Sequence, residues 1–206
     1  MATTAATTGW SGGAAPYAVP SKKLGMWLFI ISDALTFSAL LVAYSYSRIA
    51  NPNWPTPFEM YPAVTFSTIM TFCLLSSSVT MVMAVSAAHR GERGQTVKWL
   101  LATIAGGLAF VVLHANEWLH LIHSGVTPFQ NPWGVPLFGA TFFTLTGLHM
   151  THVVIGVVYL AVIATGFGRG KFESMDVEVS GLYWHFVDLV WMFIFPLVYL
   201  MSVHTG

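Results

Sequence analysis

Charged side chains are scarce in this chain: Lys, Arg, Asp and Glu make up 8% of its 206 residues, hydrophobic residues make up 55%, and the mean hydropathy is +0.68. A water-soluble domain normally carries about 25% charged residues, so the composition argues against a soluble enzyme. The formal net charge is zero. Without a basic excess, nothing indicates a nucleic-acid partner.

Cysteine is nearly absent as well, since Cys73 is the only one. A single cysteine cannot form an intrachain disulfide or a thiolate-built zinc or iron–sulfur site, and we expect it to be a packing residue. The chain also lacks an internal repeat, which disfavours a transporter built from repeated halves. No hydrophilic stretch is long enough for a separate soluble domain.

Five long apolar runs occupy most of the sequence, and each can cross about 30 Å of hydrocarbon as a helix. They cover residues 24–48, 62–88, 97–123, 136–167 and 179–203. An open sheet would leave backbone groups unpaired in lipid, and the runs lack the alternation of barrel strands. The sequence therefore predicts an all-α polytopic membrane protein, a bundle of five transmembrane helices.

Positive charges gather at one end of the predicted bundle, where seven of the eight Lys and Arg residues fall, and Arg48 stands alone at the other. The positive-inside bias then predicts a cytoplasmic N-terminus and an outside C-terminus. Residues 1–21 contain no signal-peptide core, so we expect a flexible, uncleaved tail. Residues 22–206 are predicted to form a single five-helix domain.

One acidic residue lies deep in the first run, because Asp33 is roughly 13 Å from the cytoplasmic end at the helical rise per residue. A carboxylate at this depth is costly in contact with lipid, so it should either be protonated or point into protein with a partner. In the fifth run, His185 and Asp188 share a helix face. Depth counting predicts that Asp33, His152, His185 and Asp188 meet in one polar cluster.

Two further runs carry ionisable residues. In the third, Glu117 and His120 are a candidate pair, although a position near the outer interface makes simple interfacial anchoring an alternative reading. In the fourth, His149 and His152 lie near the middle of the membrane. Two imidazoles on one helix need further ligands to hold a metal or a haem, so buried hydrogen bonding is the favoured interpretation and no metal site is predicted.

Four segments carry a resemblance to a known family. Residues 183–191, Tyr-Trp-His-Phe-Val-Asp-Leu-Val-Trp, closely resemble the terminal-helix signature of subunit III of haem-copper respiratory oxidases; its residues here include Tyr183, Trp184, Phe186 and Trp191. Residues 142–153, 113–118 and 24–37 are similar to three other family segments, in family order. The resemblance extends over residues 24–203.

The resemblance implies an accessory subunit in aerobic respiratory electron transport, without catalytic residues or redox centres of its own. Haems and copper would belong to partner subunits, chiefly the catalytic subunit I, which reduces oxygen and pumps protons. This chain would support the stability and proton uptake of that subunit, protect it from inactivation during turnover and bind phospholipid. The expected location is the bacterial cytoplasmic membrane, with membership of a respiratory supercomplex left open.

Departures from the family pattern leave the mechanism open. Longer members have seven spans, whereas this sequence has five, as do several bacterial forms that include quinol oxidases. Asp33 stands where most members have Glu, and His114 stands where many have Gln. The choice between cytochrome c and quinol as electron donor would depend on other subunits.

Two alternatives come from other functional classes. Eight histidines are compatible with a membrane cytochrome b anchor, which requires imidazoles at matched depth on facing helices. A proton or small-solute transporter could use Asp33 and Glu117 as relay groups, although the sequence lacks the repeats and broken helices of many transporters.

Overall fold

Five long helices make up nearly all of the part of the chain that the computed structural model describes, residues 20–58 and 64–203. They are α1 (Ser21–Ala50), α2 (Thr65–His89), α3 (Arg93–His123), α4 (Pro136–Gly168) and α5 (Ser174–Ile194). A π-helical turn (Phe195–Tyr199) and a 3₁₀ turn (Leu200–Ser202) extend α5. All five helices are long and apolar enough to cross a membrane, which confirms the predicted all-α fold.

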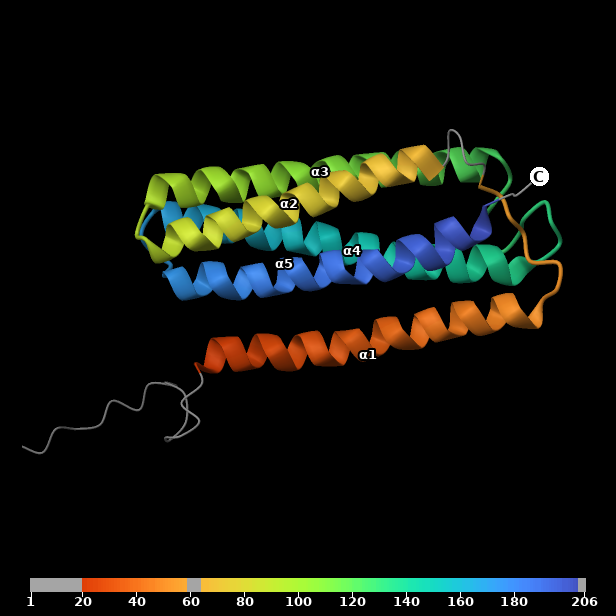
Figure 1. Ribbon diagram of the computed structural model, residues 1–206, viewed down its shortest axis with the longest axis horizontal. Helices are drawn as coiled ribbons and strands as arrows, with labels where there is room; N and C mark the ends of the chain where they lie inside the picture. The colour runs from red at the N-terminus through yellow and green to blue at the C-terminus, as the bar shows by residue number, and fades with distance from the viewer. Residues whose placement is uncertain (1–19, 59–63, 204–206) are drawn as a thin grey trace, which may run out of the picture.

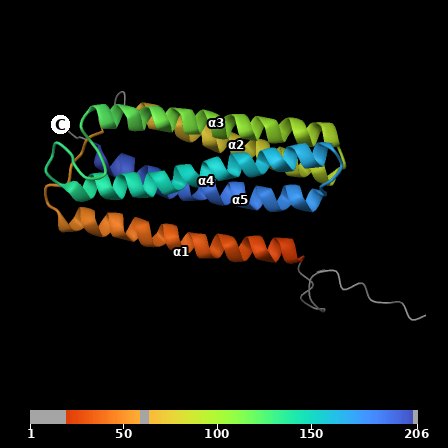
Figure 2. The ribbon, with the colours of Figure 1, turned by 180° about the vertical axis from the view of Figure 1, so that it is seen from behind.

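The helices run side by side, with α2 to α5 forming a four-helix bundle and α1 lying outside it (Figure 1). In the bundle, α2 packs on α3 and α5, and α4 packs on α3 and α5. Helix α1 packs on α4 and α5, away from α2 and α3 (Figure 2). Its buried residues Ile30, Phe37 and Tyr44 are seven apart, so a single stripe of α1 faces the bundle.

Helices α2, α3 and α4 end in the same way, at the glycine-containing breaks of the sequence. Gly91, Gly125 and Gly170 have φ values of 75°, 82° and 70°, a left-handed conformation that glycine adopts without steric cost. In each case the glycine N–H and the next residue's N–H donate to carbonyls of the last helical turn. This Schellman arrangement satisfies backbone groups that would otherwise be unpaired at the helix end.

Trp184 occupies the centre of the bundle and is fully buried. Its ring lies between glycines of two other helices: a Cβ placed on Gly107 would come within 2.5 Å of it, and one on Gly156 within 3.0 Å. Its Nε1 donates a 3.0 Å hydrogen bond to Ser77 Oγ on α2. Small residues on α3 and α4 therefore make the room into which a large α5 side chain fits.

Helix α5 differs most from its predicted bounds. It begins at Ser174, five residues before the predicted Val179, because Glu173 and Asp176 form a capping box at its start. Near its other end Pro196 has no N–H to donate to the preceding turn, and the chain passes into the π-helical turn. The capping box explains why polar residues extend a membrane helix beyond its apolar run.

Ion pairs and hydrogen bonds fasten both ends of α1. Lys22 Nζ lies 2.6 Å from Asp176 Oδ1, and Lys23 Nζ lies 2.5 Å from Glu178 Oε1. At the opposite end Arg48 donates to Ser202 Oγ at 3.0 Å and to the Met201 carbonyl. The lone cation of that end is thus engaged by the C-terminal turn of the chain.

Candidate functional site

Asp33 and His152 form a polar contact between α1 and α4. Asp33 Oδ2 lies 3.0 Å from His152 Nε2, and the two side chains are only 14% and 12% exposed. Their direction departs from hydrogen-bond geometry, so the contact is one of charge and proximity. The side chains that depth counting expected to meet are therefore in contact, and the partner that the deep carboxylate required is an imidazole.

The other nitrogen of His152 fixes which ring atom faces Asp33. His152 Nδ1 lies 2.8 Å from the Leu148 carbonyl, which can only accept, so Nδ1 carries a hydrogen. Nε2 is then the ring nitrogen that faces the Asp33 carboxyl group.

Neighbouring aromatic side chains enclose this pair. The Phe37 ring meets the His152 imidazole edge-on, with ring centroids 5.2 Å apart. Tyr183 OH donates a 3.0 Å hydrogen bond to the His152 carbonyl, so α5 also fixes this turn of α4. Phe37 and Tyr183 thus pack around this contact from α1 and α5.

His149 does not take part in this contact, although it is on the same helix. It is fully buried, its Nε2 lies 3.2 Å from the Val187 carbonyl, and its Nδ1 has no hydrogen-bond partner in the described residues. The rings of Phe110 and Trp191 pack against its imidazole, with centroids 5.6 Å and 5.0 Å away. His149 and His152 therefore serve separate helix contacts.

The other predicted pair, His185 and Asp188, faces α2. His185 Nδ1 lies 2.6 Å from Ser78 Oγ, and no contact with Asp33 or His152 is found within residues 20–58 and 64–203. Asp188 is 4% exposed, and neither of its carboxyl oxygens has a hydrogen-bond partner in the same residues. The expected four-membered cluster is thus divided, because its α5 members point to the opposite side from α1.

A second polar cluster surrounds Glu117, near the end of α3. Ser67 Oγ donates to Glu117 Oε1 at 2.9 Å, and Tyr199 OH donates to Oε2 at 2.7 Å. His114 Nδ1 lies 3.3 Å from Oε2, and its side chain is completely buried. Sequence reasoning paired Glu117 with His120 and missed the two hydroxyls, which come from α2 and from the turn after α5.

The four aromatic residues of the terminal-helix segment are buried structural anchors. Trp191 Nε1 donates to Thr71 Oγ1 on α2 at 2.9 Å, matching the Trp184 bond to Ser77. Phe186 packs edge-on against Phe37 of α1, with ring centroids 6.4 Å apart, while Tyr183 fixes α4. One segment thus joins α5 to three other helices. Across the described parts of the chain, no group of three His, Cys, Asp or Glu residues could hold a metal.

Comparison with known proteins gives a consistent result. The family model described as "Cytochrome c oxidase subunit III" matches residues 5–203. Quinol oxidase subunit 3 of Bacillus spizizenii is 36% identical over 183 residues, which are 87% of this chain and 87% of that protein. Cytochrome bo(3) ubiquinol oxidase subunit 3 of Pseudomonas aeruginosa is 34% identical, over 86% of this chain and 84% of that protein. Cytochrome c oxidase subunit 3 of Bacillus subtilis is also 34% identical, over 89% and 87% respectively.

Proposed function

Since the chain belongs to the cytochrome c oxidase subunit III family, we propose that its buried Asp33 and His152 pair supports proton uptake by the catalytic subunit of a haem-copper oxidase. The chain is an accessory subunit of such an oxidase and an integral membrane protein that associates with other oxidase subunits. The observation that carries the proposal is the 3.0 Å contact between the carboxyl and the imidazole.

The pair is suited to holding a proton rather than to holding a metal or a haem. A carboxyl group and an imidazole whose facing atoms are 3.0 Å apart can exchange a proton after a small reorientation of either side chain, because each group can hold or release one there. Asp33 and His152 lie in the half of the membrane that the positive-inside bias assigns to the cytoplasm. That is the side from which a pumping oxidase takes up its protons.

The partner of this chain is proposed to be catalytic subunit I, which would hold the haems and copper in the bacterial cytoplasmic membrane. The outward face of α1 supports an assembly role. Leu28, Leu35, Val42 and Ile49 are 60%, 69%, 68% and 82% exposed and recur every seven residues, so α1 presents a continuous apolar stripe. A stripe of this kind suits lipid or a neighbouring transmembrane helix.

Bound phospholipid is a further part of the proposal. Between α2 and α5 runs an apolar groove of about 270 Å³, lined in part by Val82, Val85 and Leu182. Its walls match a lipid acyl chain, and Glu178 lies at the end nearest the charged rim. Extracting the complex with and without delipidation, followed by lipid mass spectrometry, tests this part directly.

Proton uptake is tested with Asp33→Asn in the assembled oxidase, reconstituted into liposomes. The amide keeps the size of the side chain but cannot exchange a proton at this position. We expect proton uptake during turnover to slow several-fold and activity to be lost sooner, while this subunit remains in the complex. Asp176→Asn is the matched control, because it removes an acid from another polar contact of α1. Equal uptake in wild type and Asp33→Asn would contradict the proposal.

A further inference from the structure

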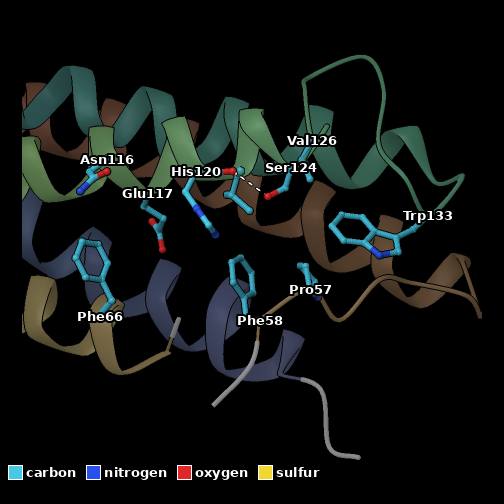
Figure 3. A pocket seen from close by; sticks show the side chains of 10 residues that line it. Pro57, Phe58, Phe66, Asn116, Glu117, His120, Ser124, Val126 and Trp133 are labelled. Carbon is cyan, nitrogen blue, oxygen red and sulfur yellow. Dashed lines mark hydrogen bonds between the residues drawn. The ribbon is translucent and has the colours of Figure 1, made fainter. Parts of the chain in front are cut away.

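A cavity of about 610 Å³ opens at the end of the bundle opposite Lys22, between the last turns of α3 and the first turn of α2 (Figure 3). It is separate from the contact between Asp33 and His152 and from the groove between α2 and α5. Its volume is within the range of about 300–1,000 Å³ that is usual for small-molecule sites. Polar residues line one side of the cavity and apolar residues line the other.

One wall of the cavity is polar and comes from a single helix. Asn116, Glu117, His120 and Ser124 all line it from α3 and its C-terminal end. The facing wall is apolar and mostly aromatic, with Phe58 and Phe66 below the α3 side chains and Trp133 at the opposite end from Phe66 (Figure 3). A ligand that fits both walls must combine hydrogen-bonding groups with an apolar body.

Among the described residues that line the cavity, Glu117 is the only one with a formal charge. Its side chain is 9% exposed and points from α3 into the space above Phe58 and Phe66 (Figure 3). Each of its oxygens accepts one hydroxyl hydrogen bond, from Ser67 or Tyr199, and Oε2 also lies 3.3 Å from His114 Nδ1. These contacts hold the carboxyl group in place, while Oε1 keeps a second acceptor site for a ligand.

His120 adds a second acceptor beside Glu117. Its imidazole points into the same space and makes no hydrogen bond to the described residues (Figure 3). A neutral imidazole offers one nitrogen lone pair. Glu117 and His120 together thus present acceptors on one side of the cavity, and the aromatic faces of Phe58 and Phe66 lie on the other.

The charge of the lining selects the ligand. The described part of the lining contains no Lys or Arg, so a phosphate or carboxylate would have no cationic partner among these residues. A carboxylate combined with aromatic rings instead favours a positively charged group, which gains both an ionic hydrogen bond and contact with the ring faces. We propose that this cavity binds the primary ammonium group of an amphiphilic amine, with Glu117 and His120 accepting its hydrogens and the aromatic wall taking its apolar body.

A photoreactive probe tests the site in the purified native oxidase complex. The probe is dodecylamine with a diazirine on its alkyl chain, and the crosslinked peptides are identified by mass spectrometry. We expect crosslinks at Phe58, Phe66 and Trp133, and about tenfold less crosslinking in Glu117→Gln, since the amide removes one charge-assisted hydrogen bond. His120→Ala should give a smaller decrease.

Three controls keep the result specific. Glu92→Gln removes an exposed acid from the opposite end of the bundle and should leave crosslinking unchanged. The same diazirine chain on dodecanol should label the cavity about tenfold less than the amine, because it carries no charge. Subunit content and the haem spectrum, measured on every variant complex, separate loss of binding from loss of assembly.

The source of the ammonium group is distinguished by competition. If phosphatidylethanolamine in nanodiscs reduces amine crosslinking and phosphatidylglycerol does not, the natural ligand is an aminolipid headgroup. If neither lipid competes, the ligand is a free amine, and the proposal stands in both cases. Equal labelling by amine and alcohol, or unchanged labelling in an assembled Glu117→Gln complex, would overturn it. If Glu117→Gln fails to assemble, the amine-to-alcohol comparison in wild type decides the question by itself.

Discussion

Asp33 of α1 and His152 of α4 place their side-chain tips 3.0 Å apart at a depth where α1 otherwise offers the bundle apolar groups. The contact crosses between the outlying helix and the four-helix bundle. The same two side chains are therefore proposed to support proton uptake and to help attach α1 to the bundle. Changes at these two positions can therefore be designed to separate the two roles.

Replacing Asp33 with Ala should leave the haem spectra of the assembled oxidase intact. No described residue of this chain contributes to a metal group, and the haems are proposed to belong to partner subunits. An optical difference spectrum of the purified complex, reduced minus oxidised, provides the measurement. Loss of the haem bands would mean that Asp33 is required for assembly itself.

Replacing both partners should be milder than replacing one. His152→Leu leaves Asp33 as a buried carboxylate without its partner, a change that typically costs about 3 kcal/mol or more in stability. In the double variant Asp33→Leu with His152→Leu, no charge is stranded, and apolar groups of similar size fill the site. Retention of this subunit during detergent purification, with Leu35→Ala on the exposed face of α1 as control, should be lower in His152→Leu than in the double variant.

Gly107→Ala should destabilise the subunit, because the added methyl group would lie 2.5 Å from the buried Trp184 ring. Overpacking of this kind typically costs about 1–3 kcal/mol. Gly25→Ala is the matched control, since its Cβ would have no atom within 4 Å. Thermal release of this subunit from the purified complex should occur at a lower temperature in the first variant alone.

His185 and Asp188 should respond differently to substitution, although both are polar residues of the same helix. His185→Leu strands the Ser78 hydroxyl, which bonds its Nδ1, and should reduce retention of the subunit. Asp188→Leu removes a buried carboxyl group that lies beside Ser78 but makes no hydrogen bond of good geometry to the described residues, so it should lower retention less than His185→Leu. Equal loss in both variants would indicate that Asp188 has a partner in another subunit.

The orientation of the bundle is predicted from charge and can be measured by labelling. In a Cys73→Ser background, Gly94→Cys and Phe129→Cys place single thiols at opposite ends of the bundle, both at exposed positions. In intact cells a membrane-impermeant maleimide should react with the second and reach the first only after the cytoplasmic membrane is opened. The reverse order would contradict the cytoplasmic N-terminus.

Sequence reasoning was most successful where a single physical rule determined the outcome. Long apolar runs with glycine-rich breaks predicted the five helices, and depth counting brought Asp33 and His152 together. It was wrong about the start of α5, since hydropathy cannot register the capping box at Glu173. It also could not show that His185 and Asp188 lie apart from Asp33 and His152. Which side of α5 faces α2 depends on packing around Trp184 and Trp191.

The surroundings of Glu117 show a second limit of sequence reasoning. Ser67 and Tyr199 are separated from Glu117 by 50 and 82 residues, and only the packed bundle brings them to its carboxyl group. A hydroxyl in an apolar run is too common to single out a partner at such a distance. Matching depth across helices would have narrowed the choice to the outer ends of α2 and α5.

The attachment of α1 has a consequence for how the protein is made. Its N-terminal lysine pairs with an acid 154 residues later in the chain, and Arg48 reaches a serine 154 residues further on. At a synthesis rate of about 5–20 residues per second, those partners are translated roughly 8–30 s after the first helix. During that interval α1 can contact only lipid, the insertion machinery or another polypeptide at these positions. In a chain that ends before α5, helix α1 would lack the partners that attach it to the bundle. Quality-control proteases would then have an unattached helix by which to recognise the incomplete product.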